Sequence, residues 1–370
     1  MRKKILLFLI PAMILLAAGL MFLRTQKPEP VYIRTAAFGR LTELIPEDPF
    51  TVYRWDGGET YAPVFTAAEG EEVWPEASAI AGETLYYTVT TEEYGGMVYR
   101  VDLPTGEKTF LGELDCNVKW LEACGEDLFL LAYDEAQRQI RLWVLREGEF
   151  IDCTRAAIRY SPISCDERGC WYVDYDSETH FSSLCYLPAD TLVPVTVYEH
   201  VPHPIELQAA PEGVYLSCQF GEDFDAGTFS LFFYPRDGSG EVKLLTELLP
   251  DGRVVTENKR EDFVPNFVLW RERLFYVTHI GWSKGVDGED AGYYLHCLDR
   301  KTGRVTDYGK FRADTGVGTV QFQYLLICGK RGFLLNESNW WATDPEGANA
   351  YSFYTWAGKR TELHDAGRSS

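Results

Sequence analysis

Acidic side chains and a few tryptophans gather in a recurring set of loops along this 370-residue chain. Carboxylate oxygens bind divalent cations and sugar hydroxyls, and an indole ring offers a flat surface on which a sugar can stack. The candidate ligand-binding residues are Asp174, Asp176, Asp223, Asp225, Trp282, Asp287, Asp290, Trp340 and Trp341. They suit a glycan, a divalent cation or a basic protein surface. The competing interpretation is that these loops are polar only because water surrounds them.

Metal chemistry has one partial motif. Asp223, Asp225 and Gly227 form D-x-D-x-G, the start of a calcium loop, but the distal glutamate that completes such a loop is missing from its expected place. Ca2+ at Asp223 and Asp225 is therefore the only metal or cofactor that we consider. The nine cysteines include no CxxC pair and no zinc-type spacing, although Cys165 and Cys170 could bridge the two sides of a turn.

Two patterns could indicate catalysis. Ser283 lies in GWSKG, which matches the G-x-S-x-G nucleophile motif, but a Gly- and Asp-rich loop follows where a helix is needed. Glu122 and Glu206 fall in predicted inner strands of different repeats, where two carboxylates could converge on a channel as a glycosidase requires. No flanking motif supports either pattern, so we assign no catalytic residue.

A repeated unit, clearest from Thr84 to Glu113, positions these residues. Its aromatic and β-branched segments predict strands at 85–90, 97–103 and 108–111, and an apolar run at 79–82 predicts another strand before them. The closing hairpin recurs from Thr51, Met97, Ile140, Leu184, Phe229, Tyr293 and Tyr351. Four strands in about 40 to 50 residues make one blade of a β-propeller. The sequence therefore predicts an all-β propeller of four-stranded antiparallel blades, seven in number, with six as the alternative.

The acidic loops follow the second strand of each unit, so in a propeller they emerge on one face of the ring. Two D-x-x-T-G segments, Asp102–Gly106 and Asp299–Gly303, are predicted to be hairpin turns. Residues 31–36 could supply a strand that completes the first blade. Cys124, Cys165 and Cys328 align with Ala81 and Ala210 of other repeats, which indicates a small buried position.

The predicted second strands LYYTVT, CWYVDYD and LFYVTH resemble the Tyr-Trp-Thr-Asp position of YWTD-type propeller repeats. The segment VYRVDLPTGE resembles the strand and turn that follow it in that repeat. Bacterial envelope proteins with degenerate repeats, such as the TolB-like propellers, are similar as well. This resemblance covers about Thr51 to Leu363 and implies a propeller that serves as a binding platform.

The first residues predict a membrane anchor. Residues 5–23 carry no charge and follow Arg2, Lys3 and Lys4, and 19 residues of helix nearly span the roughly 30 Å hydrocarbon core. A signal peptide cleaved near Ala17–Gly19 is the alternative. Basic residues before the span place the propeller outside the cell membrane. The predicted segments are residues 1–4 (cytoplasmic), 5–23 (transmembrane), 24–36 (linker and closing strand), 37–364 (propeller) and 365–370 (tail).

The net negative charge of the chain limits the classes of molecule that it can be expected to bind. Without residues 1–27, which carry five basic and no acidic side chains, the net charge falls from −21 to −26. Nucleic acids and anionic membrane surfaces both require a basic face, so neither is an expected partner. The sequence therefore predicts a single-pass, extracytoplasmic propeller that binds an envelope protein or a ligand without catalysis. A carbohydrate-active hydrolase or lyase with acidic residues at the channel is the alternative, and the oligomeric state stays open.

Overall fold

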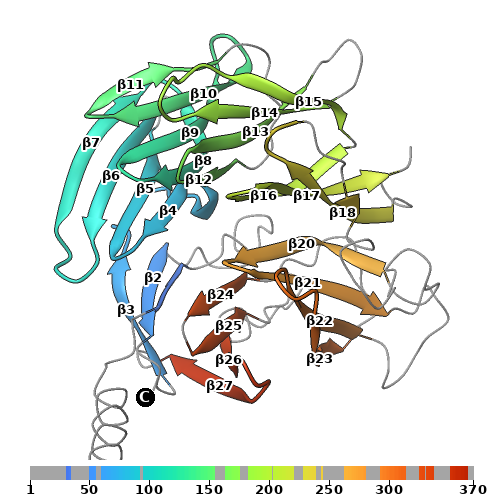
Figure 1. The fold of residues 1–370 in the computed structure, drawn as a ribbon. Helices are drawn as coiled ribbons and strands as arrows, with labels where there is room; N and C mark the ends of the chain where they lie inside the picture. Colours follow the sequence, from blue (N-terminus) through green and yellow to red (C-terminus); the bar gives the residue numbers. More distant parts are fainter. Residues whose placement is uncertain are drawn as a thin grey trace, which may run out of the picture.

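The computed structural model describes residues 31–34, 50–55, 60–91, 95–154, 163–175, 182–201, 203–220, 228–238, 243–244, 262–280, 292–313, 325–329, 331–336 and 351–365. In these residues the chain consists of β-strands and a short 3-10 turn, η1 (Pro75–Ala77). Figure 1 shows the strands as small sheets arranged around a ring. The all-β prediction is confirmed for the described part of the chain.

The strands form seven antiparallel units, which we call blades 1 to 7. Blade 1 contains β1 (Val31–Arg34), β2 (Thr51–Trp55) and β3 (Thr60–Thr66). Blade 2 contains β4 (Ser78–Ala81), β5 (Thr84–Thr90), β6 (Gly96–Asp102) and β7 (Lys108–Leu114). Blade 3 contains β8 (Asn117–Cys124), β9 (Asp127–Asp134), β10 (Gln139–Arg146) and β11 (Glu149–Asp152). Blade 4 contains β12 (Ser164–Asp166), β13 (Gly169–Tyr175), β14 (Ser182–Pro188) and β15 (Val195–Val201).

The remaining blades repeat this order. Blade 5 contains β16 (His203–Ala210), β17 (Gly213–Phe220), β18 (Thr228–Pro235) and β19 (Lys243–Leu244). Blade 6 contains β20 (Asp262–Trp270), β21 (Arg273–Ile280), β22 (Gly292–Asp299) and β23 (Val305–Ala313). Blade 7 contains β24 (Leu325–Gly329), β25 (Gly332–Asn336), β26 (Tyr351–Thr355) and β27 (Arg360–Asp365). Within each blade, strands that follow one another in the chain pair side by side.

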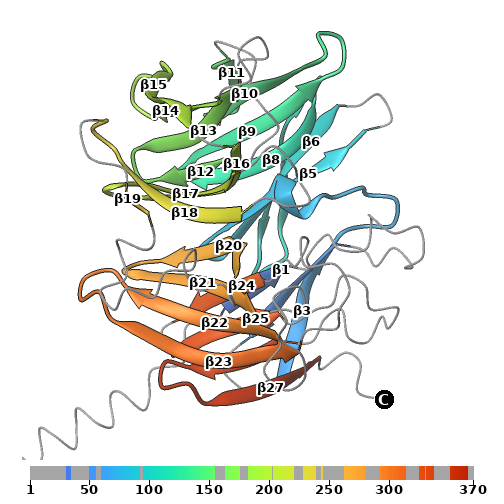
Figure 2. The same ribbon diagram turned by 90° about the vertical axis from the view of Figure 1, so that its right-hand side faces the viewer.

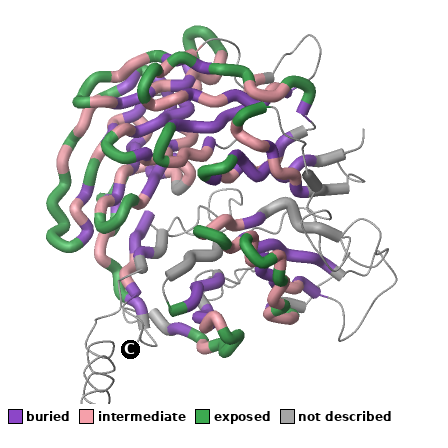
Figure 3. Tube along the Cα trace, viewed as in Figure 1, coloured by how far each residue is buried: buried purple, intermediate pink, exposed green. Residues whose placement is uncertain are grey.

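The first strand of each blade faces the centre of the ring and the last faces outward. The first strands β8, β12, β16 and β20 contact one another in turn, and Figure 2 shows blade 5 between blades 4 and 6. All eight residues of the first strand β8 are buried or half-buried. The last strand β7 exposes three of its seven residues. Figure 3 shows the same gradient, with exposed positions at the turns and outer strands. The last strand of a blade is therefore its solvent-exposed edge.

Apolar clusters between successive blades hold the ring together. Each of seven clusters joins one adjacent pair of blades, and the set includes the pair formed by blades 7 and 1. Between blades 3 and 4, for example, Phe129 and Leu142 pack against Tyr172 and Leu187. Burial of such side chains contributes about 1.5 to 3 kcal/mol each. Sheet-to-sheet packing all the way round explains why blades 2 to 6, which form separate β-sheets, assemble as a ring.

The ring closes where the two ends of the chain meet. Blades 1 and 7 share one seven-stranded sheet, because β3 pairs with β27 in parallel through Thr60 with His364 and Tyr61 with Asp365. Strand β1 pairs with β2 and lies within the 31–36 stretch that the sequence offers as a closing strand. Five buried side chains that the structure describes, among them Trp55 and Tyr61, pack behind this junction.

The turns between the first and second strands and those between the third and fourth strands lie at the same end of each blade, and together we call them the turn rim. Arg236 of blade 5 reaches back to blade 4, where it pairs with Asp166 and lies over the Tyr186 ring at 4.6 Å. Arg300 of blade 6 occupies the corresponding position and pairs with Glu212 of blade 5. The Arg300 side chain is 9% exposed, so its pairing is part of the blade interface.

Blade 7 carries a tryptophan at this position. Trp356 reaches back to blade 6, where its ring stacks on Trp270 at 5.2 Å and lies 4.3 Å from the Arg273 guanidinium carbon. The cation thus sits on the earlier blade and the ring on the later one, the reverse of the arrangement at Arg236. The same position of the turn rim therefore holds an arginine in blades 5 and 6 and a tryptophan in blade 7.

Both D-x-x-T-G segments are hairpin turns, as predicted. Thr105 donates its backbone N–H (2.9 Å) and its hydroxyl (2.6 Å) to Asp102 Oδ1, and the Thr302 N–H does the same to Asp299 Oδ1 at 2.9 Å. These bonds lower the pKa of both aspartates below its ordinary range. The closing glycines, Gly106 and Gly303, have φ of 73° and 69°, a region that suits glycine.

One alignment from the sequence is wrong by one residue. Cys124 closes its turn opposite Asp127, whereas Cys165 lies one pair further into the ladder, opposite Cys170, and Cys328 likewise lies opposite Phe333. Successive strand residues face opposite sides of a sheet, so Cys124 and Cys165 are not equivalent. All eight cysteines whose side chains the structure describes are free thiols.

The predicted anchor, residues 5–23, lies outside the described residues. In the part of the chain that is described, no helix has the length and apolarity to cross a membrane.

Candidate functional site

Of the nine candidate ligand-binding residues, only Asp174 lies in the described part of the chain. It is half-buried near the end of β13, beside Tyr172 and Cys185, and burial raises the pKa of both of these neighbours. The candidates outside the described residues are Asp176, Asp223, Asp225, Trp282, Asp287, Asp290, Trp340 and Trp341. Ser283 lies outside as well. Of these candidates, Asp174 is therefore the one whose surroundings the structure describes.

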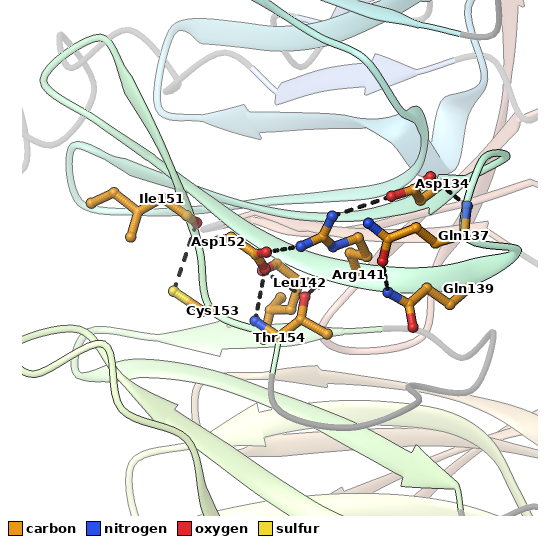
Figure 4. Close-up of polar contacts among 9 residues, drawn as sticks. All are labelled: Asp134, Gln137, Gln139, Arg141, Leu142, Ile151, Asp152, Cys153 and Thr154. Carbon is orange, nitrogen blue, oxygen red and sulfur yellow. Dashed lines mark hydrogen bonds and ion pairs between the residues drawn. The ribbon is translucent and has the colours of Figure 1, made fainter.

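Another acid of these loops is committed to the fold. Asp134, at the end of β9, accepts the Gln137 N–H at 3.0 Å and pairs with Arg141 at 3.2 Å (Figure 4). The hydrogen bond from Gln137 and the Arg141 guanidinium lower the pKa of Asp134. Arg141 also pairs with Asp152, so the cation bridges β9 and β11 across its own strand β10. This carboxylate is satisfied internally, and acidity at this loop partly serves the blade itself.

The described residues with the most unusual environment lie on the inner wall, by which we mean the first strands β8, β12 and β16. Strand β16 has a β-bulge at Ile205, after which Glu206 lies opposite Ser217 of β17. Strand β8 has the same irregularity at Lys119. A bulge changes which way the following side chains point, and bulges are common near binding sites. The shared bulge therefore orients the polar residues that come after it.

Glu206 is a carboxyl group that stays protonated at neutral pH. Burial, followed by the nearby charge of Glu122, raises the pKa of Glu206 from 4.5 to about 8. The Ser217 hydroxyl opposite it is fully buried and has no hydrogen-bond partner among the described residues. The structure thus brings together Glu122 and Glu206, the two inner-strand carboxylates that the sequence singled out. A neutral acid can donate a hydrogen bond that a carboxylate cannot.

Polar side chains of the inner wall also bind the backbone of the next blade. Gln208 donates its Nε2 to the Phe267 carbonyl and accepts the Leu269 N–H at its Oε1, each at 2.5 Å. One blade earlier, Ser164 Oγ accepts the Ala209 N–H at 2.9 Å. These bonds satisfy groups on the free inner edge of a sheet, which would otherwise be costly to bury.

Glu122 of blade 3 corresponds to Ser164 of blade 4 and Gln208 of blade 5. Each of the three lies two residues before the last residue of its first strand. The charge of Glu122 acts on Cys165 of blade 4, so this residue too faces the next blade. Sequence reasoning found Glu122 and Glu206 but missed Gln208 and Ser164. A polar residue that binds backbone groups belongs to no sequence motif. The one signal that could have revealed Ser164 and Gln208 is that a polar residue recurs at the same distance from the turn in successive blades.

A Thr–His–Asp arrangement in blade 6 resembles a nucleophile set in its distances. Thr278 Oγ1 lies 2.9 Å from His296 Nε2, and His296 Nδ1 lies 3.8 Å from Asp307. The Thr278 side chain is 2% exposed, so no substrate can approach its hydroxyl. His296 stacks on Tyr276 at 5.0 Å, as a packing aromatic residue would. No group of three or more metal-binding side chains occurs among the residues described.

Comparison with known proteins supports the architecture. No protein-family model and no curated protein sequence matches this chain. Among solved structures, the tricorn protease matches with a TM-score of 0.53 and 12% identity over 90% of this chain, which spans 35% of the protease. A periplasmic gluconolactonase from Pseudomonas aeruginosa matches with a TM-score of 0.53 and 14% identity, covering 90% of this chain and 95% of that one.

The β-propeller domain of the trilobed protease from Pyrococcus furiosus matches with a TM-score of 0.52 and 11% identity, covering 92% of this chain and 93% of that domain. TolB from Acinetobacter baumannii matches with a TM-score of 0.45 and 10% identity, covering 90% of this chain and 79% of that one. At such identities the likeness concerns the fold. The chain has the fold of a β-propeller.

Proposed function

We propose that this chain is an extracytoplasmic ligand-binding β-propeller, and that a hydroxyl-rich ligand such as a glycan contacts its inner wall at Glu206. The observation that carries the proposal is the protonated Glu206 carboxyl beside the Glu122 charge. A neutral acid and a nearby carboxylate offer a donor and an acceptor to the same sugar hydroxyl. The Ser217 hydroxyl, which has no hydrogen-bond partner in the part of the chain that the structure describes, adds a third polar group on the same side of blade 5.

Thermal unfolding of the full-length chain with a panel of oligosaccharides tests this proposal, because a ligand that binds only the native state raises the apparent Tm. We expect a larger shift at pH 6 than at pH 9, where Glu206 loses its proton. Glu206→Leu should abolish the shift, and Glu206→Gln should retain it without the pH dependence. Glu212→Gln on the turn rim is the control. A shift that survives Glu206→Leu would place the ligand elsewhere.

A second binding surface is proposed at the acidic loops around Asp174. Its members would be Asp174 with Asp176, Asp223, Asp225, Trp282, Asp287, Asp290, Trp340 and Trp341. Ca2+ at Asp223 and Asp225, or a basic envelope protein, would be the partner. A rise in Tm with millimolar Ca2+ that Asp223→Ala removes would support the metal, and an unchanged Tm would exclude it.

The proposed location is the outer side of the cell membrane, with residues 5–23 as a single-pass anchor. The uncharged length of this segment and the basic residues before it support the assignment. Fractionation of cells that express the full-length chain should place it in the membrane pellet after a high-salt wash. A chain that begins at residue 28 and is still retained there would contradict the anchor.

Acid–base catalysis on a carbohydrate is the second candidate function. The observation that favours it is the raised pKa of Glu206, since a hydrolase or lyase requires one carboxyl group that stays protonated near pH 7. Turnover of oligosaccharides that falls as pH rises through about 8, and that is lost in both Glu206→Gln and Glu122→Gln, would support catalysis. Binding without turnover would leave the non-catalytic proposal in place.

A further inference from the structure

Two cysteines face each other across the first turn of blade 4. In the antiparallel pairing of β12 and β13, Asp166 lies opposite Gly169 and Cys165 lies opposite Cys170. A two-residue turn puts a hydrogen-bonded pair next to the turn and a closer, non-hydrogen-bonded pair after it. The Cα atoms of such a pair are about 4.5 Å apart, within the range of roughly 4.4 to 6.8 Å that a disulfide spans.

The two thiols already interact, and a third lies beside them. Cys170 contributes to raising the pKa of Cys165, and the Glu122 and Cys124 groups of blade 3 do so as well. Cys124 donates its Sγ–H to the Asp166 carbonyl at 2.7 Å. Cys165 is half-buried, whereas Cys170 is fully buried. A reagent that enters the inner wall therefore meets Cys165 first.

We propose that Cys165 and Cys170 form a reversible cross-strand disulfide by exchange with a soluble disulfide. The Cys165 thiolate attacks one sulfur of the soluble disulfide, whose S–S bond breaks and releases one thiol. Cys170 then displaces the second half from the mixed disulfide. The protein loses two S–H protons and two electrons, and the soluble disulfide gains them as it becomes two thiols.

The position of this pair gives the bond a structural role. Strand β12 has three residues, whereas the first strands of the flanking blades, β8 and β16, have eight each. The shortest inner strand has the fewest backbone hydrogen bonds to its neighbour, and a covalent bond between Cys165 and Cys170 would hold it in register. In blades 2, 3, 5, 6 and 7 this position pairs Ile80 with Leu85, Ala123 with Leu128, Ala209 with Val214, Leu269 with Leu274 and Cys328 with Phe333, so none of these blades has a cysteine pair there.

The test is to incubate the full-length native chain with oxidised glutathione, block free thiols with a maleimide under acid quench, and digest with trypsin and chymotrypsin. Cleavage after Arg168 and Trp171 separates the two cysteines, so only a disulfide keeps their peptides together. We expect a linked peptide pair that dithiothreitol releases. Burial raises the pKa of Cys165, so the rate should rise about tenfold per pH unit from pH 7 to 9.

Matched variants decide the pairing. Cys165→Ala places an alanine where Ala209 stands in the next blade, and it should abolish the linked pair without loss of folding. Cys124→Ala places an alanine where Ala210 stands, and it should leave the linked pair unchanged. A wild-type chain that yields no linked pair, or one that joins Cys165 to Cys124 in place of Cys170, would overturn the proposal.

Discussion

At the inner wall a side chain of one blade reaches forward to the next blade, whereas at the turn rim a side chain reaches back. Ser164 and Gln208 reach forward and bind backbone N–H and carbonyl groups. Arg300 and Trp356 reach back and contact side chains. A backbone partner accepts only a polar residue, but a side-chain partner can change together with the residue that meets it. The rim therefore varies in chemistry and the inner wall stays polar.

The comparison predicts that the same substitution acts differently in the two regions, and Glu206→Gln should show the largest effect. Folding raises the pKa of Glu206 from 4.5 to about 8, so the unfolded carboxyl releases its proton first. The stability that protonated Glu206 contributes is complete below pH 4.5 and is lost as pH rises to about 8. Glu206→Gln should raise the free energy of unfolding at pH 8 by about 3 kcal/mol, allowing for partial solvent access.

Urea unfolding at pH 4, 6 and 8 measures this effect, with Glu212→Gln as the matched rim variant. The Glu212 side chain is 48% exposed and forms an ion pair with Arg300, so the effect of its substitution on the free energy of unfolding should depend little on pH. Equal pH profiles for the two variants would remove the distinction between the two regions.

Gln208→Leu should have the second largest effect. Leucine fills a similar volume but leaves the Phe267 carbonyl and the Leu269 N–H without their partners. Each buried, unsatisfied backbone group costs about 1 to 3 kcal/mol, so we expect a loss of roughly 2 to 4 kcal/mol of unfolding free energy in urea. Gln208→Glu is the matched second variant, because it keeps the hydrogen-bond acceptor and loses the donor. Its free energy of unfolding should lie between those of Gln208→Leu and the wild type.

How far the sequence predicts this molecule depends on what each residue contacts. The hairpin repeats predict the blades, because alternation of buried and exposed residues within a strand is a local pattern. The repeats locate the first strand of each blade, and this was enough to single out Glu122 and Glu206 as inner-strand acids. The bulge at Ile205 that orients Glu206 has no sequence signal. The misalignment of Cys165 has the same cause, since one extra residue before the turn reverses the face of the strand on which a side chain lies. The contacts of Gln208 were missed because its partners are backbone atoms of another blade.

Trp356→Arg tests whether the turn rim accepts either chemistry. Glu272 of blade 6 corresponds in position to Glu212 of blade 5, so the new guanidinium would have an acid within reach. It would lose the stacking on Trp270 and the packing against Phe333. We expect a net loss of about 1 to 2 kcal/mol in thermal or urea unfolding. A loss as large as that of Gln208→Leu would show that the rim is as demanding as the inner wall.

The smallest effect is expected for the ion pair of Arg300 and Glu212. A double-mutant cycle with Arg300→Met and Glu212→Gln should give a coupling energy below about 1 kcal/mol, because Glu212 is largely solvated. Arg300→Met alone should cost more than the coupling, since the side chain also donates to the Arg271 carbonyl at 2.6 Å. Raising the salt concentration should reduce the coupling and leave the cost of Gln208→Leu unchanged.

The pairing of β3 with β27 has a consequence for the order of folding. Six of the seven blade interfaces join segments that are neighbours in the chain, so each can form as soon as two successive blades have left the ribosome. The seventh must wait for residues near both ends, about 300 positions apart, and the chain entropy lost in that step makes it late. Nascent chains should therefore exist as an open arc of packed blades until β27 is synthesised, and mechanical pulling on the ends should separate this junction first.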